Sequence, residues 1–401
     1  MNIKTQLDRI KTRTEEIIPE DELINKLKKS QKEKRPLNVK LGIDPTSPDI
    51  HIGHMVAAKK MRDFQDLGHK GIIIIGDFTA QIGDPTGKDK TRKTLSDSEV
   101  KRNAGKYMEQ LYKILHKDKT EVRWQSSWFD KMSLNKIMEL MSMFTLAKFM
   151  EHDTFRKRYE QSLPLSLHEM LYPILQAYDS IVINADIELG ATEQKFNILT
   201  GRRLQQMLGK EPQVAILMPI LIGTDGTEKM SKSLDNYIAI FDSPKDKYGK
   251  VMSIPDSIIL NYYKYAAFAS PDELSEIEQA LKDPKINPKN LKVKLAKRVV
   301  TLYDGEEAAI KAEREFEKVF AKNKLPDDIP EFVTNENEMW VVKLLSESGL
   351  VSSNGEARRM IKQGAVKIND KKINKINLDL KLNDGMIIRV GKRRFCKIIK
   401  K

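Results

Sequence analysis

The sequence predicts an α/β protein built on a Rossmann-like, doubly wound parallel sheet, followed by an α-helical domain and a small α+β domain. Segments of apolar, β-branched residues alternate with segments of good helix formers, an order that favours a parallel sheet with helices on its faces. The run 71–77 is continuously apolar, which is typical of a strand covered on both faces. A length of 401 residues is also more than one hydrophobic core normally organises.

Composition divides the chain into four parts. Residues 1–232 hold the alternating strands and helices, preceded by a helical arm. From 233 to 322 the pattern is helical only and is broken by prolines. Residues 323–337 contain two prolines and two adjacent aspartates, and we expect a linker there. Residues 338–401 combine two short helices with strands and form the predicted α+β domain.

Positive charge is concentrated at the end of the chain. The formal net charge is +13, and the last 64 residues carry sixteen Lys or Arg against six Asp or Glu, a formal charge of +10. A folded domain this basic suits a polyanionic partner. The one cysteine, Cys396, excludes an intramolecular disulfide and a cysteine-ligated zinc site. Without an 18-residue apolar run or a signal peptide, we expect a soluble, cytoplasmic protein with no membrane contact.

The elements of the first domain follow from the same patterns. An amphipathic pattern broken near Pro19 predicts the helical arm over 3–34, and the Met- and Phe-rich stretch 132–159 is also predicted to be helical. The other predicted helices span 55–67, 98–115, 166–178 and 195–208, and the predicted strands span 37–41, 71–77, 121–124, 180–183 and 214–217.

The stretch from Gly42 to His54 joins the first of these strands to the helix that follows. It reads Gly-Ile-Asp-Pro-Thr-Ser-Pro-Asp-Ile-His-Ile-Gly-His. A helix N-terminus presents unpaired N–H groups and the positive end of the helix dipole, which together suit a phosphate. His51 and His54 add donors one turn apart, and Gly53 lets a flat group approach the backbone. Alone, the pattern fits two surface histidines on an ordinary helix equally well.

A second stretch, 223–233, reads Gly-Thr-Asp-Gly-Thr-Glu-Lys-Met-Ser-Lys-Ser. Its glycines predict a mobile loop, and Lys229 and Lys232 place two cations at its end. The two stretches lie on either side of the alternating strands and helices. Together they resemble the class I aminoacyl-tRNA synthetases, and the residues between them resemble the bacterial tyrosyl-tRNA synthetases, a resemblance that covers nearly the whole chain.

The resemblance implies an enzyme that joins L-tyrosine to ATP, releases pyrophosphate and passes tyrosine to the 3′ end of tRNA(Tyr). The carboxylate of the substrate attacks the α-phosphorus, so positioning and charge stabilisation carry the catalysis and no protein nucleophile is needed. Mg²⁺ arrives with ATP, because no cluster in the sequence resembles a dedicated metal site. A homodimer is also implied, with the stretch 132–159 at its interface.

The implied catalytic residues are cations and hydrogen-bond donors, namely His51, His54, Lys229, Lys232, Lys88 and Arg92. In the family the two histidines contact the triphosphate and the lysine pair closes over the leaving pyrophosphate. For Lys88 and Arg92 a solvated surface loop is the alternative. The other ATP-binding residues that the resemblance implies are Asp44, Thr46, Gly53, Gly190, Ala191, Glu193, Met230 and Ser231.

Tyr172, Gln176 and Asp179 are spaced by four and three residues, which places them on one face of a helix. The resemblance puts this face against tyrosine, with the first two residues at the ammonium group and Asp179 accepting from the phenolic hydroxyl. An Asp near a helix C-terminus opposes the helix dipole, which disfavours a purely structural Asp179. The other implied tyrosine-binding residues are Thr79, Asp84 and Gln194.

Three places depart from the family pattern. Lys40 stands where many members carry a tyrosine that contacts the substrate hydroxyl, so the companion of Asp179 stays open. Ala191 and Glu193 replace a Gly and an Asp of the ribose-binding turn, and Glu is one methylene longer than Asp. Glu188 replaces a more usual Gln and adds a charge near the pocket.

Residues 338–401 resemble the S4 RNA-binding module. Two short helices lead through a glycine turn into a strand, with Arg358, Arg359 and Lys362 on adjoining helical turns. A cationic face of this kind can lie against RNA phosphates and 2′-hydroxyls. The resemblance therefore implies that these three residues bind tRNA.

Other functions share part of this pattern. A tryptophanyl-tRNA synthetase has the same catalytic fold, but Asp179 and the S4-like domain speak against it. A nucleotidyltransferase would not need a tRNA-reading domain. A non-catalytic RNA-binding relative could lose the paired histidines and lysines, all of which are present.

Overall fold

The computed structural model describes residues 1–82, 96–321, 329–369, 371–391 and 394–400. The chain forms two compact units, Met1–Ala309 and Ile310–Lys401. Among the described residues, no helix combines the length and the apolar character needed to cross a membrane.

A six-stranded sheet in the order β1-β6-β5-β2-β3-β4 forms the centre of the first unit. All neighbouring strands are parallel except β1, which runs antiparallel to β6 at one edge. The chain builds outward from β2 to β4 and then crosses to β5 and β6, so the order reverses between β2 and β5. In such a sheet, ligands bind at the carboxyl ends of the strands beside that reversal. The strands span Glu16–Ile18 (β1), Asn38–Ile43 (β2), Lys70–Ile75 (β3), Thr120–Trp124 (β4), Ile187–Ala191 (β5) and Val214–Met218 (β6).

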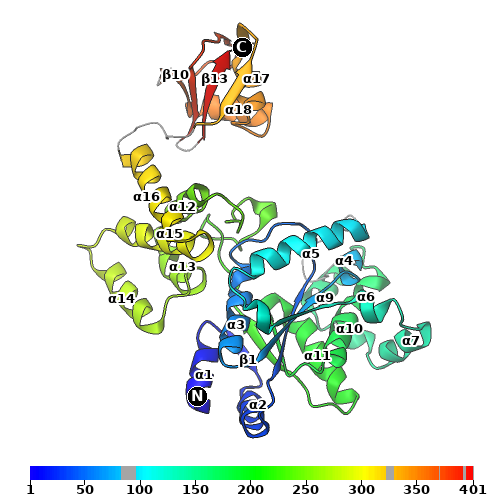
Figure 1. Ribbon diagram of the computed structural model, residues 1–401. Coiled ribbons are helices and arrows are strands. Elements are labelled where there is room, and N and C mark those ends of the chain that lie inside the picture. The colour runs from blue at the N-terminus through cyan, green and yellow to red at the C-terminus, as the bar shows by residue number, and fades with distance from the viewer. Residues whose placement is uncertain (83–95, 322–328, 370, 392–393, 401) are drawn as a thin grey trace. The chain divides into compact units, whose positions relative to one another are not determined.

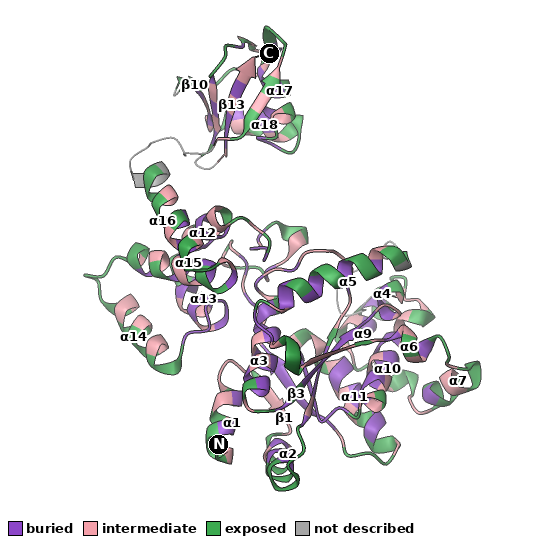
Figure 2. Cartoon of the chain, viewed as in Figure 1, coloured by how far each residue is buried: buried purple, intermediate pink, exposed green. Residues whose placement is uncertain are grey.

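Helices pack on both faces of this sheet and leave β3, β5, β6 and the middle of β2 buried, while the edge strands β1 and β4 are partly exposed (Figures 1 and 2). Ile72, Ile73, Ile74 and Ile75 of β3 are each at most 3% exposed, as expected for a strand covered on both faces. The doubly wound α/β fold is therefore confirmed. The helices of this part span Ile3–Lys11 (α1), Glu20–Glu33 (α2), His54–Asp66 (α3), Thr79–Ile82 (α4), Asp97–Leu111 (α5), Leu167–Val182 (α10) and Lys195–Met207 (α11).

The predicted strand at 180–183 is wrong, because α10 continues to Val182 and the strand β5 begins only at Ile187. Ile181 packs against the apolar cluster that α10 forms with the neighbouring short helices. Asn184, with φ of 48°, lies in the turn that follows the helix. An apolar run of four residues cannot by itself distinguish a strand from the end of a buried helix.

Two predicted helical stretches are also broken. The arm 3–34 contains the strand β1 between its two helices. The stretch 132–159 forms three short helices, because Ser133 and Thr145 each accept a backbone N–H and start a new helix. The short helices here span Ser126–Phe129 (α6), Leu134–Ser142 (α7), Leu146–Phe149 (α8) and Asp153–Glu160 (α9).

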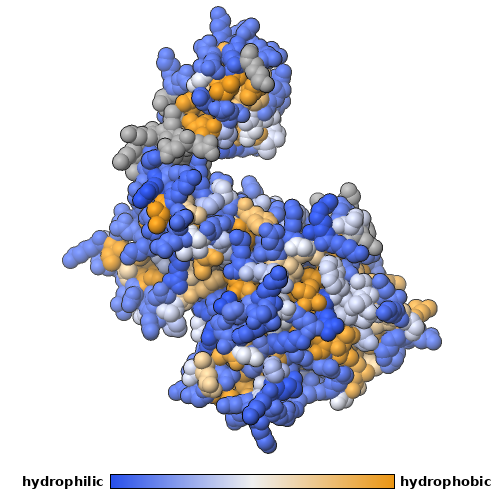
Figure 3. All heavy atoms as spheres, viewed as in Figure 1, coloured by the Kyte–Doolittle hydropathy of each residue, from blue (hydrophilic) through white to orange (hydrophobic). Residues whose placement is uncertain are grey.

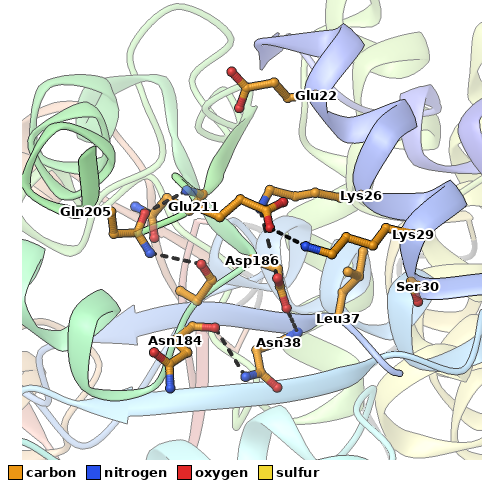
Figure 4. Close-up of polar contacts among 12 residues, drawn as sticks. Glu22, Lys26, Lys29, Ser30, Leu37, Asn38, Asn184, Asp186, Gln205 and Glu211 are labelled. Carbon is orange, nitrogen blue, oxygen red and sulfur yellow. Dashed lines mark hydrogen bonds and ion pairs between the residues drawn. The ribbon is translucent and has the colours of Figure 1, made fainter. Parts of the chain in front are cut away.

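Ion pairs fix α2 across the amino ends of the strands, away from the pocket described below (Figure 4). Lys26, with 3% of its surface exposed, contacts Glu211 at 3.1 Å and Asp186 at 3.9 Å. Asp186 also accepts from the backbone N–H of Asn38 at 2.8 Å and pairs with Arg35 at 2.9 Å. These contacts tie the start of β2 to the segment before β5, so the two strands on either side of the reversal are held in register.

A group of helices completes the first unit and leads into the second (Figure 1). The buried ammonium of Lys247 bonds both carboxylate oxygens of Asp304, at 2.9 and 2.8 Å, and joins the first of these helices to the fourth. The helices span Pro244–Met252 (α12), Ile259–Tyr265 (α13), Pro271–Lys282 (α14), Pro288–Asp304 (α15) and Glu306–Ala321 (α16).

The second unit has a five-stranded sheet in the order β10-β9-β12-β13-β7 and a two-stranded sheet of β8 and β11. Two helices pack over a core that includes Val342, Leu345 and Ile361. β7 pairs with β13, so residues 331–334, assigned to the linker from the sequence, are part of this fold. Its elements span Glu331–Thr334 (β7), Glu338–Trp340 (β8), Val341–Glu347 (α17), Asn354–Lys362 (α18), Val366–Ile368 (β9), Lys371–Ile373 (β10), Asp379–Lys381 (β11), Ile387–Val390 (β12) and Arg394–Lys400 (β13).

Candidate active site

A pocket of about 470 Å³ opens at the carboxyl ends of β2 and β5, where the strand order reverses. Its walls come from the loop after β2, the start of α3, the helix α10, the turn after β5 and the loop before η3 at Lys232–Leu234. The predicted residues that line it are Asp44, Thr46, His51, Gly53, His54, Thr79, Tyr172, Gln176, Asp179, Gly190, Ala191, Glu193, Gln194, Lys229, Met230 and Ser231.

The two histidines meet at the N-terminus of α3. Their ring centroids are 4.0 Å apart, and Nδ1 of His54 lies 3.3 Å from the backbone of His51. A Cβ atom at Gly53 would lie 2.9 Å from Nδ1 of His51, so the glycine makes the approach of this ring possible. The helix therefore begins with both imidazoles lining the same pocket, while the N–H groups of His54, Met55 and Val56 donate to the backbone three residues before them.

Both imidazoles are neutral at pH 7. Burial lowers the pKa of His51 to about 2 and that of His54 to about 4, and the positive charge of Lys232 adds to both shifts. A neutral ring donates one hydrogen bond without bringing a charge of its own. The positive charge for a phosphate chain must then come from the lysines.

Buried Asn236 anchors the Gly-rich loop. Its side chain donates to Oδ2 of Asp225 at 2.5 Å and to the carbonyl oxygen of Lys229 at 3.0 Å, and accepts from the N–H of Ser231 at 2.8 Å. A side chain at Gly223 would collide with the Nδ2 atom of Asn236, 2.1 Å away. The side-chain amide of Asn236 thus holds the loop on both sides of Met230. The sequence analysis did not identify Asn236 as a site residue.

The two loop lysines have different partners, and only Lys229 lines the pocket. Lys229 forms an ion pair of 2.6 Å with Glu193, and Lys232 donates to Oγ of Ser47 and the carbonyl oxygen of Asp49. The first pair is solvent-exposed, so it contributes about 0–1 kcal/mol and opens at little cost. Burial lowers the pKa of Lys232 from its usual value.

The opposite end of the pocket is a chain of hydrogen bonds. Tyr172 donates to one oxygen of Asp44 at 2.9 Å, and Thr79 donates to the other at 2.8 Å. Thr79 also contacts Oε1 of Gln125 at 2.9 Å. The amide of Gln125 donates to Asp179 at 2.7 Å, which continues the chain to the far wall.

Asp179 lies on α10 with 1% of its surface exposed. Gln125 and Trp128, whose indole N–H is 3.2 Å away, each bond one carboxylate oxygen. Burial raises the pKa of Asp179 to about 7, against the opposing effects of Lys40 and these two donors. The pocket therefore ends in a hydrogen-bond acceptor aimed at a space that an aromatic hydroxyl can enter.

Gln125 and Trp128 were not predicted as site residues. Both follow β4, at the carboxyl edge of the sheet, and this position is the signal that could have identified them. Asp84, Lys88 and Arg92 lie outside the described residues. Within the described part of the chain, no group of three or more His, Cys, Asp or Glu is placed to hold a metal ion.

Arg358, Arg359 and Lys362 are exposed on α18 in the second unit. Ala357 and Ile361 of the same helix are buried, so the helix presents its cations to solvent and its apolar side to the core. The guanidinium of Arg358 stands 5.4 Å from the ring centroid of Trp340, a cation–π contact.

Two protein-family models match the chain. The model described as tRNA synthetases class I (W and Y) covers residues 31–321, and the model of the tyrosine–tRNA ligase SYY-like C-terminal domain covers 321–398.

Curated relatives match over nearly the full length. The tyrosine–tRNA ligase of Carboxydothermus hydrogenoformans is 50% identical over 99% of this chain and 98% of its own. That of Moorella thermoacetica is 46% identical over 99% of this chain and 96% of its own.

Solved structures share the fold. A truncated mitochondrial tyrosyl-tRNA synthetase of Aspergillus nidulans has a TM-score of 0.65 at 20% identity, over 79% of this chain and 94% of its own. The enzyme of Archaeoglobus fulgidus in complex with L-tyrosine has a TM-score of 0.63 at 23% identity, over 78% and 100%. With matches to both family models and 46–50% identity to full-length relatives, this chain belongs to the tyrosyl-tRNA synthetase family of class I aminoacyl-tRNA synthetases, the tyrosine–tRNA ligases.

Proposed function

We propose that the pocket between β2 and β5 is where this ligase activates L-tyrosine with MgATP and then transfers it to tRNA(Tyr). The observation that carries the proposal is the convergence, in one pocket, of two imidazoles, Lys229 and a buried carboxylate, with Lys232 on the same loop just outside the lining. The tyrosine carboxylate attacks the α-phosphorus, the bond to the β-phosphate oxygen breaks, and pyrophosphate leaves. The 3′-terminal ribose hydroxyl of tRNA then attacks the carbonyl carbon of the adenylate and AMP leaves.

The ATP side of the pocket acts by positioning and by charge. His51 and His54, both neutral, donate to the triphosphate beside the N-terminus of α3. Lys229 and Lys232 exchange their present oxygen partners for oxygens of the leaving pyrophosphate, where negative charge develops in the transition state. Mg²⁺ enters with ATP and offsets part of the phosphate charge. The ribose and adenine lie against Gly53, Gly190, Ala191, Glu193 and Met230.

The tyrosine side of the pocket recognises both polar ends of the amino acid. Asp179 accepts from the phenolic hydroxyl, and Tyr172 and Gln176 lie toward the ammonium group. Because Lys40 is held by other acceptors, the nearest companion groups of Asp179 are Gln125 and Trp128. A site that hydrogen-bonds a substrate hydroxyl discriminates strongly against an analogue that lacks the hydroxyl. The known example is this enzyme family, whose preference for tyrosine over phenylalanine is about 10⁵-fold.

The second unit supplies the tRNA-binding surface in this proposal. Its exposed arginines and lysine on α18 face solvent, and its last 64 residues carry a formal charge of +10. Such a charge attracts RNA phosphates, and this attraction weakens as salt rises.

We also propose a homodimer that buries the apolar face of α7 and its neighbours. Leu134, Met138 and Met141 lie on one side of α7 and are 72%, 57% and 41% exposed, while Leu146 and Leu167 nearby are 60% and 83% exposed. Figure 3 shows apolar atoms at the edge of the first unit that carries α7, within a mostly hydrophilic surface. An exposed apolar face of this extent is typical of a protein–protein interface.

Tyrosine-dependent exchange of pyrophosphate into ATP tests the pocket assignment. We expect the full chain to catalyse exchange with tyrosine and far more slowly with phenylalanine or tryptophan. Asp179→Ala is expected to reduce the preference for tyrosine over phenylalanine by about tenfold or more, because a buried phenol then lacks its acceptor. The KM for ATP serves as the control and stays near its original value. If the variant keeps the full preference, Asp179 does not recognise the hydroxyl.

A further inference from the structure

Behind the pocket wall lies a pair of buried charges that does not line the pocket. Lys40 of β2 is 0% exposed and Glu188 of β5 is 1% exposed, and Nζ of Lys40 lies 2.9 Å from Oε1 of Glu188. The two strands are neighbours, and the pairing register places these residues directly opposite each other. The pair thus sits at the strand-order reversal, directly beneath the candidate tyrosine site.

The ammonium of Lys40 has no capacity left for a substrate. Its three N–H donors meet the carbonyl oxygen of Gln176 at 2.7 Å, Oγ of Ser180 at 2.8 Å and the carboxylate of Glu188. Two of these acceptors belong to α10, the helix that carries the tyrosine-binding face. Lys40 therefore pins α10 to the sheet and neutralises Glu188.

Glu188 in turn fixes the side chain of Gln176. Nε2 of Gln176 donates to Oε1 of Glu188 at 3.1 Å, while Ser180 and Gln213 contact the other carboxylate oxygen. An ionised carboxylate accepts hydrogen bonds and cannot donate, so the nitrogen of the Gln176 amide must face Glu188. The carbonyl oxygen Oε1 of Gln176 is then left for the pocket, which this residue lines.

From these contacts we propose that Lys40 and Glu188 are positioning residues that lock the amide of Gln176 with its carbonyl oxygen toward the substrate ammonium group. Without a fixed acceptor for Nε2, the side-chain amide of Gln176 has two orientations. In one of them it turns its NH2 group, a donor, toward the cationic ammonium group of the substrate. The pair thus raises selectivity for the α-ammonium group without touching the substrate. This inference rests on the proposed tyrosine site, because it takes the ammonium to lie against Gln176.

Two double variants separate the acceptor from the charge. Lys40→Met with Glu188→Gln removes both charges and keeps one oxygen that can accept from Gln176, beside an NH2 group that can donate. Lys40→Met with Glu188→Met removes both charges and the acceptor, with unbranched side chains of similar length. Removing both partners together avoids leaving one buried charge unpaired.

The readout is the ratio of dissociation constants for L-tyrosine and 3-(4-hydroxyphenyl)propionate, which lacks only the ammonium group. We expect the Lys40→Met, Glu188→Met variant to lose about tenfold of the wild-type preference for tyrosine, since a hydrogen bond to a charged group is lost. The Lys40→Met, Glu188→Gln variant is expected to lose less, about threefold, because the introduced glutamine side chain keeps an oxygen for Gln176 but its own NH2 group can also donate to it. The KM for ATP is expected to stay unchanged in both, which separates this effect from general damage to the fold.

Gln176→Ala separates two claims: that the ammonium group lies against Gln176, and that Lys40 and Glu188 orient the Gln176 amide. If Gln176→Ala loses the preference and the Lys40→Met, Glu188→Met variant retains it, the positioning role is wrong and the tyrosine site stands. If Gln176→Ala also retains the preference, the ammonium lies elsewhere and the assignment of the site itself fails.

A crystal structure of the unaltered chain with L-tyrosine gives a second test that needs no variant to fold. We expect the ammonium nitrogen within hydrogen-bond distance of Oε1 of Gln176, with Nε2 still on Glu188. An amide of Gln176 that has left Glu188, or an ammonium group out of its reach, overturns the inference.

Discussion

At the residue scale, burial decides which groups of the pocket carry charge. Desolvation by the surrounding protein keeps His51 and His54 neutral, although His54 keeps an exposed surface, and full burial of Asp179 lets it titrate near neutral pH. The lysines keep partners that a phosphate can replace: an exposed carboxylate for Lys229, and a hydroxyl and a backbone carbonyl for Lys232. The proposed binding of ATP therefore depends on the imidazole donors and the lysines, and the proposed binding of tyrosine on the one buried carboxyl group.

The raised pKa of Asp179 predicts that tyrosine binding depends on pH. Below pH 7 the carboxyl group is protonated, and above pH 7 it is ionised and accepts from the phenolic hydroxyl. We expect the dissociation constant for tyrosine to rise toward tenfold per pH unit as pH falls below about 7. Titration calorimetry between pH 6 and pH 8 measures this, and His51 and His54 do not titrate in that range.

Asp179→Asn is the matched control for the pH prediction. It keeps the size of the side chain and an accepting oxygen, but it does not titrate. We expect weaker binding that is flat across this pH range. A pH dependence that persists unchanged in Asp179→Asn would assign the titration to another group.

Residue types and spacing predict most of the pocket. The paired histidines, Lys229 and the Tyr172, Gln176, Asp179 face all line one cavity, whereas Lys232 lies next to it in the chain without lining it. The supporting residues Gln125, Trp128, Asn236 and Lys40 could not be predicted in the same way. For Gln125 and Trp128 the one signal is their place after β4, while the role of Asn236 depends on the path of its loop and that of Lys40 on contacts with a helix distant in sequence.

At the scale of elements, the alternation of strands and helices predicts the sheet. The prediction of an element fails where a short apolar segment fits both a strand and a buried helix. The apolar residues at 180–183 serve the packing of α10, and the strand that they were expected to form lies at Ile187–Ala191. β1 is a three-residue antiparallel strand at the sheet edge, too short for a sequence pattern. Tertiary pairing rather than local preference creates such an element.

The Gly-rich loop is an element whose position depends on one side chain. Asn236→Ala removes two donated bonds and one accepted bond from the loop. We expect adenylate formation to slow by about tenfold to a hundredfold, because the lysines lose their fixed approach to pyrophosphate. Tyrosine affinity should not change. Stopped-flow measurement of the activation step, beside a tyrosine titration, checks both.

Lys232→Ala provides the comparison for the loop. It removes the charge and leaves the Asn236 contacts in place, so it is expected to slow the same step with the same unchanged tyrosine affinity. If Asn236→Ala activates tyrosine at the normal rate while Lys232→Ala does not, the lysine acts without the anchor.

At the scale of the whole molecule, the residues of the pocket gather in one unit and excess charge gathers in the other. The described pocket residues all lie between Leu41 and Ser231, within the first unit. The last 64 residues carry +10 of the formal +13. Composition predicts a separate basic domain at 338–401, but it places the start of that domain too late, because β7 at Glu331 joins its sheet only through pairing with β13.

Cutting the chain after residue 321 is the most direct test of this division of labour. The cut keeps α16 whole and removes β7 with the rest of its sheet. We expect the shortened chain to retain tyrosine-dependent pyrophosphate exchange near the full-length rate, while charging of tRNA(Tyr) falls by about a hundredfold or more and tRNA binding becomes less dependent on salt. Charging at the full-length rate would contradict a tRNA-binding role for the second unit, and loss of exchange in a folded fragment would contradict a complete activation site in the first.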